Sequence, residues 1–341
     1  MAFTFTELAV PIAGAPMAGG PGTPALAAAI SNAGGLGFIA GGYRTPGQLA
    51  DDIGAARALT TGPLGVNLFV PQPSVADMIL LDDYAVRLEQ LADHYGVAVG
   101  RPRPDEDDDC WPEKLEVVAD VRPTVVSFTF GTPQPEDLEM LRELRILTLV
   151  TVTSAYEAGI AIGHGADGLV VQGPDAGAHR GTFAPDVPPG IESLSELLEA
   201  IGHAHGEVPL VAAGGLGTAD DVAGVLRRGA VAAQVGTALL LCDEAGTNPT
   251  HRAALQNPEF TKTIVTSAFS GRYARSLEND FTRNFDVGAP LGYPEVNHMT
   301  APIRAAAAAM EDPHGTSLWA GTGYRSARPG PAADIIAGLY T

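Results

Sequence analysis

The chain has 341 residues, of which 45% are hydrophobic and 18% charged, so a disordered or coiled-coil protein is excluded. Its 20 basic and 40 acidic residues give a net charge of −20, which repels nucleic-acid backbones and anionic membrane surfaces. No apolar stretch reaches the roughly 20 residues needed to span a bilayer, and residues 1–18 contain no basic side chain to begin a signal peptide. We therefore expect a soluble, cytoplasmic protein.

Short runs rich in β-branched residues alternate along the chain with Ala- and Leu-rich stretches, which is typical of repeated strand–helix units. The eight predicted strands are Val10–Ala15, Gly37–Ala40, Leu64–Phe69, Thr124–Phe130, Ile146–Val152, Gly168–Gln172, Pro209–Gly214 and Ala232–Gly236. The six predicted helices between them are Pro24–Ala33, Pro46–Leu59, Pro135–Leu144, Ala155–Gly163, Ser193–His203 and Ala219–Arg228. Eight parallel strands in sequence favour an α/β protein built as a closed (β/α)₈ TIM barrel over an open doubly wound sheet.

Two segments depart from this repeat. The first, 71–122, is expected to be an inserted segment with a helix around Val75–Tyr95, followed by the acidic run 105–109. Adjacent carboxylates in a loop repel one another, so we interpret this run as a solvated loop tip rather than a cation site. The second segment, 241–341, is too long for a single closing helix. We therefore predict a barrel over 1–240 and a helical C-terminal extension over 241–341 that covers the barrel mouth and contributes to the substrate pocket.

Candidate functional residues follow the ends of several predicted strands. In β/α barrels the loops after the strands share one face, and active sites lie there. Residues 14–20 form a loop of small side chains that admits a flat ligand to the backbone, and Asn67 is polar within an otherwise apolar run. The loop 172–181 carries several groups that can titrate or form hydrogen bonds.

The seventh and eighth strand–helix units predict a phosphate site. Gly214 and Gly215 lie in a glycine-rich turn that leads into a helix, and Gln234-Val-Gly-Thr237 ends the next strand. Glycines allow backbone N–H groups to converge on an anion, and the helix N-terminus adds a favourable dipole. Either motif alone could be only a tight turn. Together they indicate a phosphorylated cofactor.

His179 differs from the other histidines because it lies in a loop on the predicted active face. A histidine there can act as a base or as a hydrogen-bond donor, because its pKa lies near neutrality. A purely structural loop residue is the alternative. The sequence contains no cluster of Cys, His and carboxylate residues with metal-ligand spacing, and Cys110 and Cys242 stand alone, so no metal site or disulfide is predicted.

Several collinear motifs resemble the nitronate monooxygenase family. They are Pro11-Ile-Ala-Gly-Ala-Pro-Met-Ala-Gly-Gly20, Ser31-Asn-Ala-Gly-Gly-Leu-Gly37, Gly65-Val-Asn67, Gln172-Gly-Pro-Asp-Ala-Gly-Ala-His179, Ala213-Gly-Gly215, Gln234-Val-Gly-Thr237, Thr266-Ser-Ala-Phe-Ser-Gly-Arg-Tyr-Ala-Arg275 and Leu318-Trp-Ala-Gly321. The resemblance implies a flavin mononucleotide (FMN) barrel that oxidises alkyl nitronates, such as propionate 3-nitronate, with molecular oxygen.

The resemblance also implies roles for individual residues. Ala15, Pro16 and Met17 would line the flavin ring, Asn67 and Gln172 would hydrogen bond to it, and Gly177 would lie at its edge. The residues around the phosphate of FMN would be Gly214, Gly215, Gln234, Val235, Gly236 and Thr237. His179 would be the active-site histidine.

Two departures from the family pattern concern the substrate side. Asp175-Ala-Gly-Ala-His179 stands where the family usually has Glu-Ala-Gly-Gly-His, and Thr322 stands where it usually has Gln. These changes keep FMN binding but leave the substrate open. The alternatives are an NAD(P)H-dependent reductase of the same barrel type, acting on quinones or enoyl-acyl-carrier proteins, and a non-catalytic flavin-binding protein. The sequence leaves the oligomeric state open, a homo-oligomer included.

Overall fold

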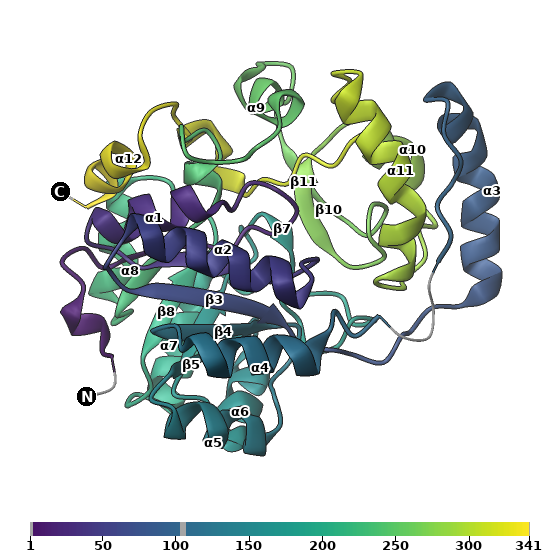
Figure 1. The fold of residues 1–341 in the computed structure, drawn as a ribbon. Helices are drawn as coiled ribbons and strands as arrows, with labels where there is room; N and C mark the ends of the chain where they lie inside the picture. Colours follow the sequence, from purple (N-terminus) through teal and green to yellow (C-terminus); the bar gives the residue numbers. More distant parts are fainter. Residues whose placement is uncertain (1–2, 103–106, 341) are drawn as a thin grey trace.

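A computed structural model describes residues 3–102 and 107–340 (Figure 1). Eight parallel strands in this part of the chain form the main sheet, in the order β1-β9-β8-β6-β5-β4-β3-β2. They are β1 (Ile12–Gly14), β2 (Gly37–Ala40), β3 (Leu64–Phe69), β4 (Val125–Thr129), β5 (Leu147–Val152), β6 (Gly168–Gln172), β8 (Leu210–Ala213) and β9 (Ala232–Val235). All eight predicted strands are confirmed; three have the predicted bounds and the others differ by one or two residues at an end.

The sheet closes on itself between its first two strands. Leu36, directly before β2, donates its N–H to the carbonyl of Ile12 in β1 at 2.9 Å, and Gly14 donates to the carbonyl of Leu36 at 2.9 Å. A parallel bridge between Ala13 and Leu36 completes the contact. The (β/α)₈ barrel is therefore confirmed, and the carboxyl ends of its strands form one rim.

The six predicted helices are all present: α1 (Pro24–Asn32), α2 (Pro46–Leu59), α5 (Pro135–Glu143), α6 (Ala155–His164), α7 (Leu194–Ala204) and α8 (Ala219–Arg227). Thr23, Thr45, Ser154, Ser193 and Thr218 cap five of them with side-chain oxygens. These caps satisfy amide groups that have no partner within the first turn of a helix. The strands are buried on both faces, as expected for a parallel sheet covered by helices.

The segment 71–122 contains two helices with different neighbours. Helix α3 (Met78–His94) packs against α11 of the tail, whereas α4 (Trp111–Val121) packs against α2 and β3. In Figure 1, α3 stands apart from the barrel at the right edge, and α4 lies beside the other outer helices. Helix α4 therefore serves as the barrel helix between β3 and β4. This helix was not predicted apart from the insertion, because the segment lacks a clear strand–helix spacing.

The acidic run makes specific contacts where the structure describes it. Residues 105 and 106 lie outside the described residues. Asp109 forms an ion pair with the buried Lys114 at 2.7 Å, and Asp107 lies 3.0 Å from His298 of α11. The interpretation of a solvated loop tip is therefore wrong for Asp109, which pairs with a buried lysine of α4, whereas Asp107 stays exposed although it contacts His298 of the tail.

The tail is helical in part and also supplies strands. It contains α9 (Pro249–Gln256), β10 (Thr263–Thr266), β11 (Ala274–Leu277), α10 (Asp280–Phe285), α11 (Glu295–Ala309) and α12 (Ala332–Leu339). Strands β10 and β11 pair with the short β7 (Ala178–His179) in a second, antiparallel sheet, which sequence analysis did not predict. The end of the tail returns to the barrel, because α12 packs against α1 and α8.

The division of the chain into a barrel over 1–240 and an extension over 241–341 stays a prediction. Within the described residues, no helix combines the length and apolarity that crossing a bilayer requires. Cys110 is exposed and Cys242 is buried, and neither forms a disulfide.

We expect Gly37→Ala to lower the free energy of unfolding by at least about 2 kcal/mol, because the added methyl group would overlap the carbonyl oxygen of Ala27 in α1. Gly54→Ala is the matched control, since its added methyl group meets nothing within 4 Å on the exposed face of α2. That control should gain about 0.5–1 kcal/mol from improved helix propensity. Urea denaturation of both variants measures the difference, and equal effects would contradict the strand–helix contact.

Candidate active site

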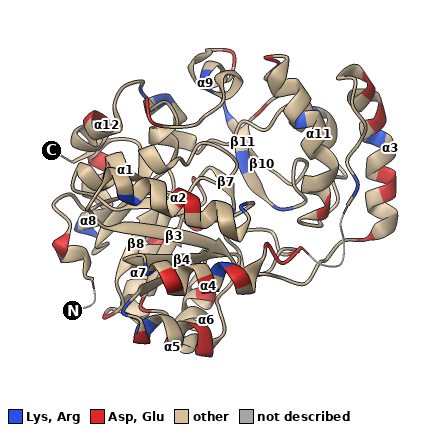
Figure 2. Ribbon diagram, viewed as in Figure 1, with Lys and Arg blue, Asp and Glu red and all other residues tan. Residues whose placement is uncertain are grey.

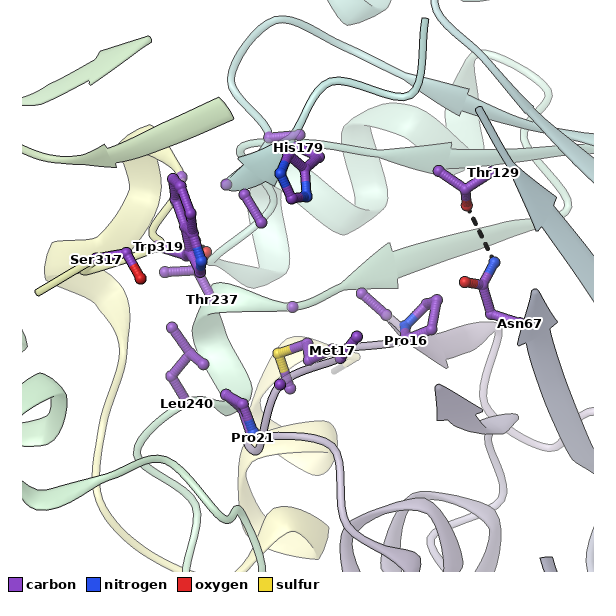
Figure 3. A pocket seen from close by; sticks show the side chains of 18 of the residues that line it. Pro16, Met17, Pro21, Asn67, Thr129, His179, Thr237, Leu240, Ser317 and Trp319 are labelled. Atoms are coloured by element: carbon purple, nitrogen blue, oxygen red, sulfur yellow. Dashed lines mark hydrogen bonds between the residues drawn. The ribbon is translucent and has the colours of Figure 1, made fainter. Parts of the chain in front are cut away.

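A cavity of about 440 Å³ lies at the carboxyl rim of the barrel, between strand ends and tail (Figure 3). Twelve of the predicted site residues line it: Ala15, Pro16, Met17, Asn67, Gln172, Gly177, His179, Gly214, Gly215, Gln234, Gly236 and Thr237. They come from five segments, at or after the ends of β1, β3, β6, β8 and β9, so the barrel brings together residues that are far apart in the sequence. Val235 is the exception.

Val235 points away from the cavity. Its side chain is 1% exposed and belongs to the hydrophobic core of the barrel. Its carbonyl oxygen accepts a hydrogen bond from the N–H of Ala15 at 2.7 Å, which ties the ends of β9 and β1 together. Alternation along a strand explains this, since Gln234 and Val235 must face opposite sides. A role for Val235 in cofactor binding can therefore come only from its backbone.

The predicted phosphate site is a cradle that leaves no room for side chains. Gly214 and Gly215 have φ angles of 106° and 76°, in the region that favours glycine. A Cβ on Gly215 would lie 2.8 Å from the Cβ of Asp175, and one on Gly236 would lie 3.1 Å from that of Ala15. The backbone N–H groups of Gly215 and Gly236 have no hydrogen-bond partner among the described residues. Unpaired amides in a glycine cradle beside a helix N-terminus suit a phosphate group.

Residues of the C-terminal tail cover this glycine cradle. Gly321 donates its N–H to the Oγ1 of Thr237 at 2.9 Å, and a Cβ on Gly177 would lie 2.5 Å from the same nitrogen of Gly321. The N–H of Thr322 donates to the carbonyl of Asp175 at 3.1 Å. Two of the three positions at which this chain departs from the family pattern, 175 and 322, are therefore in backbone contact, and the third is Ala178.

Two amide side chains on the barrel strands are partly used within the protein. The Nδ2 of Asn67 donates to the Oγ of Ser127 and to the Oγ1 of Thr129, both at 3.0 Å, which leaves its Oδ1 without a partner among the described residues. Gln172 bonds both sides of the following loop: its Nε2 donates to the carbonyl of His179 at 3.1 Å and its Oε1 accepts from the N–H of Gly181 at 2.9 Å. Gln172 thus shapes the loop that carries His179.

His179 lies in β7 rather than in an irregular loop, and β7 pairs with β11. The residue before it, Ala178, has a φ of 60°, a conformation that glycine adopts more readily. The Nε2 of His179 lies 2.8 Å from the Oγ of Ser270, and the same Oγ donates to the carbonyl of Arg272 at 3.2 Å. With the serine proton directed to that carbonyl, Nε2 carries the histidine proton and Nδ1 keeps a lone pair for a base.

Aromatic rings surround the imidazole of His179. The centres of Phe130, Tyr293 and Trp319 lie 5.7, 5.4 and 5.6 Å from its own. Burial lowers the pKa of His179 to about 3, and the positive charges of Arg272 and Arg304 contribute in the same direction. The imidazole is therefore neutral at pH 7, which a general base requires.

Two fully buried arginines support the His179 loop. Arg180 donates to the carbonyl of Gly173, and Arg272 donates to the Oε1 of Gln72 at 2.7 Å and lies 4.0 Å from the ring centre of Phe130. Neither has a carboxylate at ion-pair distance in the part of the chain that the structure describes. Burial lowers the pKa of each to about 10, so both stay charged at neutral pH.

Four residues of the site are not among those predicted from the sequence: Tyr43, Phe130, Ser270 and Arg304. Phe130 ends a predicted strand, and Ser270 lies within the motif 266–275, so both had a usable signal. Arg304 lies in an alanine-rich stretch of α11 with no motif around it. Its place in the cavity wall follows only from the way the tail folds over the barrel. No group of three or more metal-ligating side chains occurs among the described residues.

Comparison with known proteins agrees with this geometry. The family model described as nitronate monooxygenase matches residues 3–341. Nitronate monooxygenase of Pseudomonas aeruginosa is 38% identical, over 96% of this chain and 94% of its own. A solved nitroalkane oxidase from Streptomyces ansochromogenes is 43% identical with a TM-score of 0.94, over 98% of this chain and 95% of that one. FabK from Thermotoga maritima is 25% identical with a TM-score of 0.75, over 98% and 93%.

A closed (β/α)₈ barrel with a large cavity at the carboxyl ends of its strands defines a barrel enzyme. The family match over the whole described chain specifies which one: the protein belongs to the nitronate monooxygenase family of oxidoreductases. The resemblance predicted from the motifs is confirmed.

The low pKa of His179 predicts a pH-dependent contribution to stability. Folded chains keep this ring neutral down to about pH 3, whereas unfolded chains protonate it below about pH 6.5. The folded state thus binds fewer protons, and stability is lost as the pH falls through this window. Between pH 7 and pH 5 we expect the parent chain to lose about 1–2 kcal/mol more than His179→Asn.

Urea unfolding of both chains at each pH provides the measurement. His251, whose pKa burial lowers to about 4, is present in both chains, so its contribution cancels. Parallel stability curves for the two chains would show that the ring of His179 is not desolvated.

Proposed function

We propose that the protein binds FMN and oxidises alkyl nitronates, such as propionate 3-nitronate, with molecular oxygen. The observation that carries this proposal is the composition of the cavity. It combines a glycine cradle with unpaired backbone amides and a neutral histidine among aromatic rings. The family assignment and the nitroalkane oxidase relative support nitronate or nitroalkane oxidation as the reaction.

The residues present fit FMN. Gly214, Gly215, Gly236 and Thr237 would hold the phosphate, and Ala15-Pro16-Met17 would offer a wall of small and apolar groups to the ring. Asn67 and Gln172 would hydrogen bond to the polar edge of the ring, and Gly177 would let the backbone approach it. When bound, FMN supplies redox chemistry by accepting electrons from the substrate and passing them to oxygen.

The residues around His179 would hold the substrate and move its proton. Phe130, Tyr293 and Trp319 exclude water from one side of the site. A neutral nitroalkane must lose its α-proton before oxidation, and the Nδ1 of His179 would take it while Ser270 holds Nε2. A preformed nitronate has already lost this proton, so His179 would then only orient its oxygens.

The cytoplasmic location and the absence of a metal, of nucleic-acid partners and of membrane partners stay predictions, and the oligomeric state stays open. An NAD(P)H-dependent reductase of the same barrel type is the alternative. A non-catalytic flavin-binding protein is the third possibility.

We expect Gly215→Leu to purify with little or no FMN, because its side chain would meet Asp175 and block the approach of the phosphate to the backbone. Flavin absorbance per polypeptide measures the loss, and circular dichroism checks that the variant is folded. Gly338→Leu is the control, since its added Cβ meets nothing within 4 Å in α12. A folded Gly215→Leu variant with full FMN content would place the phosphate elsewhere, and a parent chain that binds no added FMN would end the proposal.

Anaerobic stopped-flow mixing tests the reaction. The yellow protein should bleach with propionate 3-nitronate and not with NADH or NADPH. His179→Asn should slow bleaching by neutral nitroalkanes by about a hundredfold or more, the usual effect of removing a general base, while preformed nitronates are affected much less. Its FMN content is checked first.

Other results of the same experiment would favour one of the alternative functions or another role for His179. Bleaching by a nicotinamide alone would favour the reductase, and no bleaching by either would favour a non-catalytic protein. An equal loss with nitroalkane and nitronate would assign His179 to orientation only, and unchanged rates would show that it is a structural residue.

A further inference from the structure

Tyr43 lies in the loop between β2 and α2, in a backbone conformation that a distant segment holds in place. Its φ is 66°, in the left-handed region that side chains other than glycine rarely adopt. Its N–H donates to the Oδ1 of Asp109 at 3.0 Å, across 66 positions of the sequence. Asp109 itself has a φ of 56°. Strained residues of this kind persist only where surrounding contacts fix them, and they are concentrated at functional sites.

Lys114 in turn holds the carboxylate of Asp109. The side chain of Lys114 is only 2% exposed, and its Nζ lies 2.7 Å from the Oδ2 of Asp109. A buried cation needs a partner that compensates for its lost hydration, and no other carboxylate among the described residues lies at ion-pair distance from Lys114. Figure 2 shows acidic residues on the outer helices α3, α5 and α6 and also in the loop that enters α4, where Asp109 lies. Asp109 therefore uses one carboxylate oxygen for Lys114 and the other for Tyr43.

The side chain of Tyr43 belongs to an aromatic wall, which consists of Tyr43, Phe69, Phe130 and Tyr293. The first three of these residues line the cavity. The ring centre of Phe69 lies 5.6 Å from that of Tyr43 and 4.7 Å from that of Phe130. The ring centres of Phe130 and Tyr293 are 5.6 Å apart, and the hydroxyl of Tyr293 donates to that of Tyr43 at 3.0 Å. The aromatic wall is therefore a closed circuit of contacts that joins three barrel segments to the tail.

His179 lies against two members of the aromatic wall. Its ring centre is 5.7 Å from that of Phe130 and 5.4 Å from that of Tyr293. Asp109 is not among the described residues that line the cavity, so its effect on His179 must pass through Tyr43. Without the oxygen of Asp109, Tyr43 would relax from its left-handed conformation and its hydroxyl would part from that of Tyr293. Water would then enter the wall beside the imidazole.

We propose that Asp109 is a positioning residue for proton removal by His179. Together with Lys114 it fixes Tyr43 in the aromatic wall, and the closed wall keeps water away from the imidazole. This inference rests on the proposed function, in which His179 takes the α-proton of a neutral nitroalkane. It also gives a role to the acidic loop before α4, which the proposed function by itself does not use.

A matched pair of variants isolates the contact between Asp109 and Tyr43. Both variants carry Lys114→Met, so that neither leaves a buried lysine without a partner. In the first, Asp109→Asn keeps a side-chain oxygen for the N–H of Tyr43. In the second, Asp109→Gly removes it. Glycine and asparagine both tolerate the φ of 56° at this position, so the two variants differ in the acceptor and not in backbone strain.

Anaerobic stopped-flow reduction of the FMN-loaded variants measures the effect on the reaction. With neutral nitroalkanes, the Asp109→Gly form should react about tenfold or more slowly than the Asp109→Asn form, because its base is misplaced. The loss should fall on the limiting rate constant and not on substrate affinity. With preformed nitronates the two forms should agree within about threefold. In a Tyr43→Phe background, which lacks the hydroxyl bridge to Tyr293, the difference should fall below about twofold.

NMR of isotope-labelled histidine provides a readout that needs no turnover. In the parent chain, burial keeps the pKa of His179 at about 3, so its signal should not move between about pH 8 and pH 5. The signal is assigned by its loss in His179→Asn. Water at the imidazole raises the pKa, so the signal should shift above about pH 5 in the Asp109→Gly form and not in the Asp109→Asn form. The groups with charge or a titrating proton that face the imidazole, Arg272, Arg304 and Tyr293, are the same in both forms.

Three results would overturn the role of Asp109. They are equal nitroalkane rates for the two forms, an unmoved His179 signal in the Asp109→Gly form, and a difference that persists in the Tyr43→Phe background. If the Asp109→Gly form does not fold, Tyr43→Phe alone decides, since loss of the hydroxyl bridge should move the His179 signal and slow the nitroalkane reaction in the same way. Parent behaviour of that variant would refute the inference.

Failure of the proposed function is recognised separately. A parent chain that oxidises neither nitronates nor nitroalkanes would refute the proposed function. The NMR comparison would still decide whether Asp109 controls the access of water to His179.

Discussion

The active face depends on one short contact, the antiparallel pairing of β7 with β11. The pairing sets Ala274 opposite His179 and Arg275 opposite Ala178, and the N–H of Arg180 donates to the carbonyl of Tyr273 at 2.8 Å. It joins a barrel loop to the tail, so the histidine and the walls of its cavity come from segments nearly a hundred residues apart. Ala178 adopts a left-handed conformation there, at a cost of about 1 kcal/mol that the pairing on its C-terminal side must offset.

Desolvation and charge act together around His179. No Asp or Glu among the described residues lines the cavity although the chain is strongly acidic, and the positive charges of Arg272 and Arg304 act on His179. These charges and burial keep the imidazole neutral, as a base must be, but they also weaken it as a base.

The C-terminal tail both completes the barrel and covers its mouth. Helix α12 packs against α1 and α8, at the gap between the last strand and the first, while α9, β11 and α11 lie over the carboxyl rim (Figure 1). Between them, Trp319 and Gly321 reach the cavity, where Gly321 bonds to Thr237. Because the same segment ends the barrel and roofs the cavity, closure of the fold and formation of the site are linked.

The sequence by itself determined the eight strands, the six intervening helices and the glycine cradle. These features rest on local patterns: β-branched runs, caps at helix starts and glycines where a side chain cannot fit. It also indicated Asn67, Gln172 and His179, because active residues of such barrels lie at or after the carboxyl ends of the strands. Only the tertiary structure decided the pairing of β7 with β11, the contact of Asp107 with His298 and the place of Arg304. Each of these depends on contacts between segments far apart in the chain, and no local pattern records which distant group will arrive.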